Sequence, residues 1–160
     1  MHYSNWDINQ TCHNAKNVLR KVNGLREEVS HLKLETSLSA IQYDGMPKGD
    51  TNENGTENAL IRQIAELDED RYRLEHQIIM VEKTLDVMGE PTQEAQQLST
   101  LLQLRYLERL SVRGCCERLA DLFNLDYISE SKFHRDEREA LLLFTRIYPE
   151  RDALIVHIDD

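Results

Sequence analysis

Basic and hydroxyl side chains cluster near the end of the chain, within ten consecutive residues. They are Ser129, Ser131, Lys132, His134, Arg135 and Arg138. Such side chains bind phosphate oxygens and the edges of bases, and the first turn of a helix attracts phosphate through its dipole. The cluster therefore predicts a DNA-binding site, in which an arginine reads a base and a lysine neutralises a phosphate.

A helix-turn-helix over residues 111–144 is predicted to position this cluster. Such a motif needs a supporting helix, a sharp turn and a recognition helix that crosses the first one steeply. Leu119 and Ala120 supply the medium and small side chains that such a crossing requires, and Leu125 is expected to fill the turn.

The recognition helix is expected to begin after Ser129 or Ser131, either of which can act as its cap. Its inward stripe is predicted to be Phe133, Ala140 and Leu141, with Glu137 at the edge of that stripe. The basic side chains then face outward and are expected to enter the major groove.

The charge of the chain leaves a second interpretation open. The net charge is −10, whereas affinity for DNA comes largely from Lys and Arg on phosphates. Residues 92–148 hold eight basic and nine acidic residues, so most of the acidic excess lies elsewhere. If Lys132, Arg135 and Arg138 share one positive face, DNA binding is favoured. If Asp136 and Glu139 neutralise that face, the alternative is a protein-binding module that acts through a coiled coil.

A family resemblance supports the first interpretation. The segment ISESKFHRDEREALLLFTRIY resembles the C-terminal signature of phage late-gene transcriptional regulators of the ArpU/RinA type. The matching residues are Ser129, Ser131, Phe133, Arg135, Ala140, Leu141 and Phe144, with Arg105 and Tyr106 upstream and the DGMPKGD loop further back. The resemblance covers about residues 40–150, and in layout it is similar to region 4 of sigma factors. It implies sequence-specific binding to promoter DNA in a phage or prophage.

Two long amphipathic helices are predicted before this domain, at about residues 4–40 and 56–89. Apolar residues recur in each at alternating spacings of three and four, which is typical of a coiled-coil seam. The first seam is Ile8, Thr11, Ala15, Val18, Val22, Leu25, Val29 and Leu32, and the second is Leu60, Ile64, Leu67, Arg71, Leu74, Ile78, Val81, Leu85 and Met88. The seams can bury each other as an antiparallel hairpin or pair with a second chain, and the spacing does not choose between these.

Local signals suggest where the elements begin and end. Ser4 is a candidate cap for the first helix, Thr92 and Ser111 are candidate caps further on, and Gly89 with Pro91 predicts a stop. Residues 41–55 are rich in Gly, Asp and Asn and predict a long loop. Residues 153–159 are expected to form a short strand or an extended tail on the helices.

The sequence gives little support for metal binding, disulfide bonds or catalysis. Cys115 and Cys116 are adjacent and point about 100° apart on a helix, so with Cys12 they predict neither a metal site nor a disulfide framework. We expect one of the pair in the core and the other partly exposed. Neither a nucleophile elbow nor a phosphate loop occurs, so we expect no enzyme activity, no cofactor and no metal.

The sequence thus predicts an all-α protein with three parts. Residues 1–91 form the coiled-coil region, 92–148 the helix-turn-helix domain and 149–160 an acidic tail. Expected partners are double-stranded DNA and a second copy of the chain, with RNA polymerase as a further candidate. No run of about 20 apolar residues occurs, so we expect no membrane contact and a location in the cytoplasm of a bacterial host.

Overall fold

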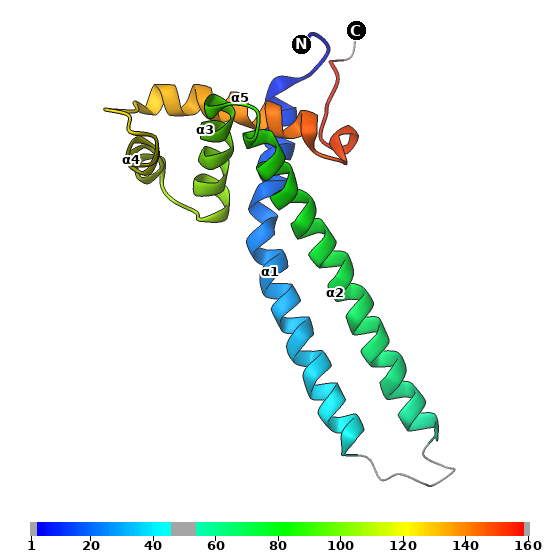
Figure 1. Ribbon diagram of the computed structural model, residues 1–160. Helices are drawn as coiled ribbons and strands as arrows, with labels where there is room; N and C mark the ends of the chain where they lie inside the picture. Colours follow the sequence, from blue (N-terminus) through cyan, green and yellow to red (C-terminus); the bar gives the residue numbers. More distant parts are fainter. Residues whose placement is uncertain (1–2, 46–53, 159–160) are drawn as a thin grey trace. The chain divides into compact units, whose positions relative to one another are not determined.

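The computed structural model describes residues 3–45 and 54–158, and within these ranges the chain is helical without a strand (Figure 1). The predicted all-α class is therefore confirmed. The elements are α1 (Ile8–Asp44), α2 (Asn54–Gly89), α3 (Gln93–Leu102), the π-helical turn η1 (Gln103–Leu107), α4 (Val112–Phe123), α5 (Glu130–Ile147) and the 3-10 turn η2 (Arg151–Ala153). The predicted loop 41–55 is shorter at both ends than expected, and residues 46–53 lie outside the described ranges.

Packing divides the chain into two compact units. Unit 1 comprises residues 1–22 and 79–160, and unit 2 comprises residues 23–78. These boundaries differ from the predicted ones at residues 91 and 148, because the beginning of α1 and the end of α2 belong with the C-terminal helices. The extended end of the chain also packs within unit 1.

Unit 2 is an antiparallel pair formed by the later part of α1 and the earlier part of α2 (Figure 1). Polar side chains join the helices: the Lys33 ammonium lies 3.8 Å from the Glu75 carboxylate, and the Tyr43 hydroxyl donates to Glu57 at 3.0 Å. The predicted seam runs between the helices in this unit, where Val29, Leu32, Leu60 and Ile78 are buried. Other seam positions are only half-buried, namely Leu25, Ile64, Leu67, Arg71 and Leu74.

Unit 1 holds a dense apolar core. Its α3, α4 and α5 pack against one another (Figure 1), and Phe133 and Phe144 of α5 are fully enclosed. The first part of α1 and the end of α2 contribute further buried side chains: Thr11, Ala15, Leu19, Val22, Val81, Leu85 and Met88. Leu19 is buried although it lies outside the predicted seam, because this part of α1 is covered on more than one side.

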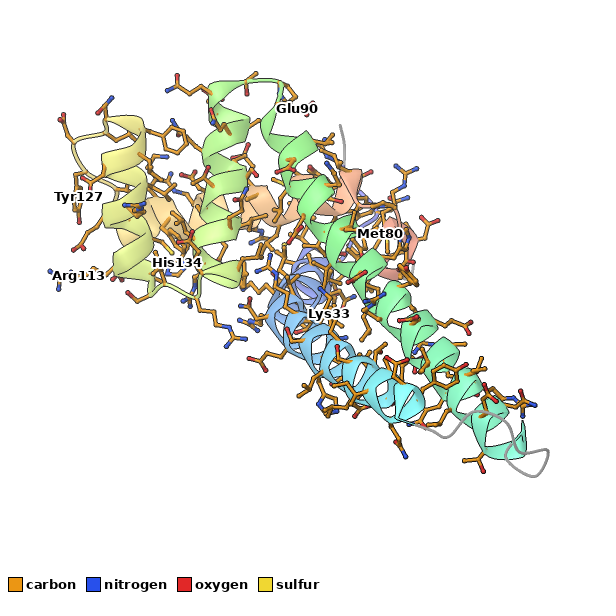
Figure 2. All side chains as sticks on the ribbon, turned by 60° about the horizontal axis from the view of Figure 1, so that its bottom comes forward. Lys33, Met80, Glu90, Arg113, Tyr127 and His134 are labelled. Carbon is orange, nitrogen blue, oxygen red and sulfur yellow. The ribbon has the colours of Figure 1, made fainter. Side chains whose placement is uncertain are left out.

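The turn from α2 to α3 is tight, and Figure 2 shows Glu90 there. The predicted stop is confirmed, since α2 ends at Gly89. A Cβ at Gly89 would lie 3.2 Å from the Cβ of Ser99, and the Ser99 hydroxyl donates to the Leu85 carbonyl at 2.6 Å. Gly89 therefore allows a close approach of α3 to the end of α2 as well as ending the helix.

Three of the predicted caps are confirmed. Thr92, Ser111 and Ser129 accept hydrogen bonds from the backbone N–H groups of Ala95, Gly114 and Lys132, so Ser129 rather than Ser131 caps α5. The prediction for Ser4 is wrong. Asp7 performs that role by accepting from Gln10 N–H at 3.0 Å, and α1 begins one residue later.

The connection between α4 and α5 differs from the predicted turn. It runs over residues 124–129 and is longer than the three or four residues of a typical helix-turn-helix. Asn124 ends α4 in the left-handed conformation, at φ 53°. Leu125 was expected to fill the turn but is 37% exposed, and the buried side chain there is Ile128. Figure 2 shows Tyr127 at this connection, where its side chain is 79% exposed.

The end of the chain is an extended segment packed on α1. Val156 N–H donates to the Thr11 hydroxyl, and Asn14 donates to the Leu154 carbonyl. A single antiparallel bridge joins Trp6 to His157 in the described part of the chain. Of the two predicted forms, the extended tail is therefore the observed one.

Candidate nucleic-acid interface

Helix α5 presents the predicted outward and inward faces. Ser131, Lys132, His134, Arg135 and Arg138 are exposed, whereas Phe133, Ala140 and Leu141 are at most 1% exposed. Ser129 is half-buried and its oxygen is engaged in capping α5. The predicted division of this helix into an apolar stripe and a polar face is thus confirmed.

The polar face does not form one positive surface, because Lys132 lies in acidic surroundings. Its ammonium is 2.6 Å from the Asp136 carboxylate. Both side chains line a hollow that also contains Glu94 and Glu139. Three carboxylates surround one cation here, so this side of α5 is unfavourable for phosphate.

The other side of α5 lies in basic surroundings. His134 and Arg138 line a hollow of about 380 Å³ together with His13 and Lys16 of α1, and Glu137 is the one acidic residue in its lining. Arg135 lies three positions from both Lys132 and Arg138, so it stands between the two sides of the helix. The structure thus brings two of the predicted residues, His134 and Arg138, close to basic side chains that come from the first helix.

A second basic hollow lies in the same unit. It has a volume of about 340 Å³ and is lined by Arg20, Arg105, Tyr106 and Arg109. Arg109 has φ 59°, a left-handed conformation that is uncommon for a residue with a side chain. Arg105 also donates to the Leu110 carbonyl at 2.8 Å, which fixes the loop that leads into α4.

A buried network joins the two hollows. The Tyr106 hydroxyl donates to Glu137 at 3.1 Å, and the Lys16 ammonium lies 3.7 Å from the other oxygen of the same carboxylate. The Arg20 guanidinium lies over the Tyr106 ring, 5.6 Å from its centre. Glu137 was expected at the edge of the apolar stripe but is 8% exposed, because these partners satisfy its charge within the fold.

The protonation state of Tyr106 follows from this environment. Burial raises the pKa of Tyr106 far above its usual range, and the negative charge of Glu137 raises that pKa further. The hydroxyl therefore stays protonated and acts as a donor near neutral pH.

The basic residues around the two hollows are together called the cationic surface. They are His13, Lys16, Arg20, Arg105, Arg109, His134 and Arg138.

Five of these residues were missed as binding candidates by reasoning from the sequence. Lys16 and Arg20 resemble the solvated face of a coiled coil, and Arg105 and Arg109 lie in separate short elements. One signal was available: residues 8–22 contain two Lys and one Arg and no acidic residue, in a chain of net charge −10. Such a run is unusual beside the mixed charges of the later part of the same helix.

The cysteines are all buried. Cys115 is fully enclosed and Cys116 is 7% exposed, so the expectation that one of the pair would be partly exposed is wrong. Burial raises the pKa of Cys115 to about 11, and it also raises the pKa values of Cys12 and Cys116. None of the three thiols is therefore activated as a thiolate near neutral pH.

The described residues offer neither a metal cluster nor a membrane span. Within residues 3–45 and 54–158, no three His, Cys, Asp or Glu side chains are grouped so that they could hold a metal ion. In the same ranges, none of the helices has the length and apolar character needed to cross a bilayer.

Comparison with known proteins adds no relative. No family model matches the chain, and neither a curated protein nor a solved structure matches it significantly.

Proposed function

We propose that this protein binds duplex DNA through the cationic surface of unit 1 and acts as a transcription regulator. The observation that supports the proposal most strongly is the gathering of cations from three separate segments around two adjoining hollows. The three segments are the beginning of α1, the η1 region and the outer side of α5. A surface that collects basic residues in an acidic protein is suited to a polyanion.

In this proposal α5 supplies the contacts to bases and the other segments supply contacts to phosphates. Arg138 is exposed about 120° around α5 from Lys132, and the exposed Arg135 lies between these two residues on the helix surface. An arginine at such a position can donate two hydrogen bonds to guanine. Arg20 and Arg109 lie on the second hollow, where contacts to the sugar-phosphate backbone would set the position of α5 on the duplex.

The resemblance to phage late-gene regulators is consistent with this proposal and supplies the biological setting. Promoter DNA of a phage or prophage is therefore the first target to test. In this proposal the acidic hollow around Lys132 lies on a different side of α5 from Arg138.

Arginine-to-alanine variants measured by fluorescence anisotropy on labelled duplex fragments test the proposal. Arg138→Ala should weaken binding by about 5- to 150-fold on the preferred sequence, which corresponds to a base contact worth about 1–3 kcal/mol, and should weaken it less on other sequences. Arg109→Ala should weaken binding to all DNA sequences equally, because phosphate contacts carry no sequence information.

Arg62→Ala is the matched control, since Arg62 is an exposed arginine of α2 in unit 2. This variant should bind DNA like the parent. Circular dichroism must show that all variants are folded. If Arg109→Ala and Arg138→Ala bind as tightly as the parent, or if the parent binds no duplex, the proposal is wrong.

A second candidate function is a protein-binding module, and the connection between α4 and α5 favours it. Leu125 and Tyr127 are exposed there by 37% and 79%, and Leu122 in the last turn of α4 is exposed by 49%. Exposed apolar side chains gathered on one segment often mark a protein contact. If the parent shows no salt-sensitive binding to duplex DNA, this function becomes the leading one, and Tyr127→Ala should then abolish capture of the partner.

A further inference from the structure

The hollow beside η1 gathers three guanidinium groups without a counter-charge. It is lined by Arg20, Arg105, Tyr106 and Arg109, and Glu108 is not part of the lining. No ion pair in the described part of the chain involves any of the three guanidiniums. Like charges held together repel one another, and the walls of a hollow focus their field. An anion in the hollow would therefore relieve a repulsion that the fold itself leaves in place.

Two of the guanidiniums are positioned by contacts with neutral groups. Arg105 donates to the Leu110 carbonyl at 2.8 Å. A guanidinium has five N–H donors, so Arg105 keeps donors for a further acceptor. The Arg20 guanidinium lies over the Tyr106 ring, 5.6 Å from its centre, and this attraction holds it without a carboxylate. Both groups are therefore placed at the hollow before any ligand arrives.

The backbone of η1 and its loop brings Arg109 to the same hollow. The Glu108 N–H donates to the Gln103 carbonyl at 2.9 Å, which is the five-residue step of a π-helix. The Leu110 N–H donates to the Leu104 carbonyl at 3.0 Å. Arg109 lies between these two bonds with φ 59°, a conformation that glycine adopts without strain and other residues adopt rarely. The loop is thus fixed on both sides of Arg109.

The side chains of the lining indicate the chemical class of the ligand. A guanidinium binds carboxylates and phosphates through paired N–H groups. A carboxylate offers two oxygens in one plane, whereas a phosphate group at the end of a molecule offers three around one atom. Three guanidiniums from different positions therefore fit a phosphate better than a carboxylate. Tyr106 is only 4% exposed, so the lining gives little apolar surface to the rest of a ligand.

The neighbouring hollow is less suited to a phosphate group. It has one guanidinium in its lining, that of Arg138, beside the two histidines His13 and His134. Glu137 also lines it, and its carboxylate lies 3.7 Å from the Lys16 ammonium. A carboxylate thus already compensates part of the positive charge there, which is not so in the hollow beside η1.

We propose that the hollow beside η1 is a discrete site for one phosphate group, bound by Arg20, Arg105 and Arg109 together. Free phosphate and the terminal phosphate of a small ester offer this chemistry, and so does a backbone phosphate of DNA. The site shares residues with the proposed DNA surface. It does not require that surface, because the three guanidiniums bind the phosphate group itself.

An NMR titration with sodium phosphate tests the site without DNA. Sodium chloride keeps the ionic strength constant, which separates binding from a general effect of salt. The parent should show saturable shifts at millimolar phosphate in the amides of residues 103–110 and around Arg20. Arg109→Gly should weaken phosphate binding by about tenfold or more, because it removes a charge-assisted hydrogen-bonding group. It should keep the fold, because glycine adopts φ 59° without strain.

A second variant and a matched control complete the titration. Arg20→Gln should also weaken phosphate binding by about tenfold or more, and it should stay folded because Arg20 is exposed. The control is Arg113→Ala, since Arg113 is an exposed arginine of the same unit that pairs with Glu117 at 3.2 Å. This control should bind phosphate like the parent. A parent without saturable shifts overturns the proposal, and so do shifts centred on His134 or unchanged binding in both variants of the hollow.

Competition with labelled duplex DNA identifies the source of the phosphate. If a backbone phosphate occupies the hollow, free phosphate at constant ionic strength should displace the duplex from the parent. If the duplex stays bound while the hollow fills, the ligand is free phosphate or a small ester. Both results support the site. A parent that binds phosphate but no duplex keeps the site and contradicts the proposed function, whereas a parent that binds duplex but no phosphate overturns the site alone.

Discussion

The two units bury their side chains to different depths. In unit 1, twelve of the larger side chains are less than 2% exposed, among them Phe133, Phe144 and Leu85. In the described part of unit 2, the most deeply buried side chain is Val29, at 6%. The same kind of seam therefore gives a closed core in one unit and a shallow one in the other.

The difference lies in the number of elements that surround each seam. Two helices alone cover each other along one stripe and leave water access to its flanks. In unit 1, α3, α4, α5 and the extended end of the chain pack around the core together with α1 and α2. A binding surface needs side chains held in place by rigid elements, and the cationic surface lies on the unit that meets this condition.

The largest expected effect is that of Phe133→Ala. Phe133 is fully enclosed, so the variant removes apolar packing and leaves a cavity, at a cost of about 3–5 kcal/mol in the free energy of unfolding. Chemical denaturation followed by circular dichroism measures this cost. A decrease below about 1 kcal/mol would mean that unit 1 is not the closed core described above.

Two leucines of the coiled-coil seams allow a direct comparison of the units. Leu85 in unit 1 is 1% exposed and Leu32 in unit 2 is 7% exposed. Leu85→Ala should cost about 3–4 kcal/mol, whereas Leu32→Ala should cost at most about 2 kcal/mol, because water can reach the space that it leaves. Hydrogen exchange should show the same order, with the amides of unit 2 opening before those of unit 1. Equal costs and equal protection would remove the distinction between the units.

Two tyrosine–glutamate hydrogen bonds, one in each unit, test the same difference in burial through smaller changes in stability. Tyr106 donates to Glu137 at 3.1 Å in unit 1, where both residues are buried, and Tyr43 donates to Glu57 at 3.0 Å in unit 2, where both are half-buried. Tyr106→Phe should cost about 1.5–3 kcal/mol, since it deprives a buried carboxylate of its donor. Tyr43→Phe should cost about 0.5 kcal/mol or less, because water can replace the missing hydroxyl. Thermal melts of both variants measure these costs, and the reverse order would contradict the assigned burial.

The sequence predicted the elements well because their signals are local. Alternating apolar spacings identified α1 and α2, and hydroxyl side chains at Thr92, Ser111 and Ser129 identified three helix starts. The inward and outward sides of α5 followed from helical periodicity alone. The fit of Ile128 rather than Leu125 into the turn could not be predicted in this way, because both are apolar and only the path of residues 124–129 decides between them.

The candidate interface was harder to predict because it depends on interactions between distant segments. Lys132 and Arg138 look equivalent in the sequence, but packing places one beside Glu94 and the other beside Lys16. In the sequence the charged Glu137 does not fit the apolar stripe. In the structure Tyr106 and Lys16 lie next to it and satisfy its charge. Local patterns contain no information on these partners, which lie 31 and 121 positions away in the chain.

The salt dependence of DNA binding tests the central claim most directly. Affinity falls with salt concentration according to the number of phosphates that the protein neutralises. Replacing Arg20, Arg109 and Arg138 together by alanine should lower the slope of log K against log salt by about one unit for each phosphate that is no longer neutralised, and so by about two units, because Arg138 is assigned to a base. Lys132→Ala should leave the slope unchanged, because Asp136 already neutralises that ammonium. A slope that falls with Lys132→Ala but not with the triple arginine variant would place the DNA on the opposite side of α5 and contradict the proposed interface.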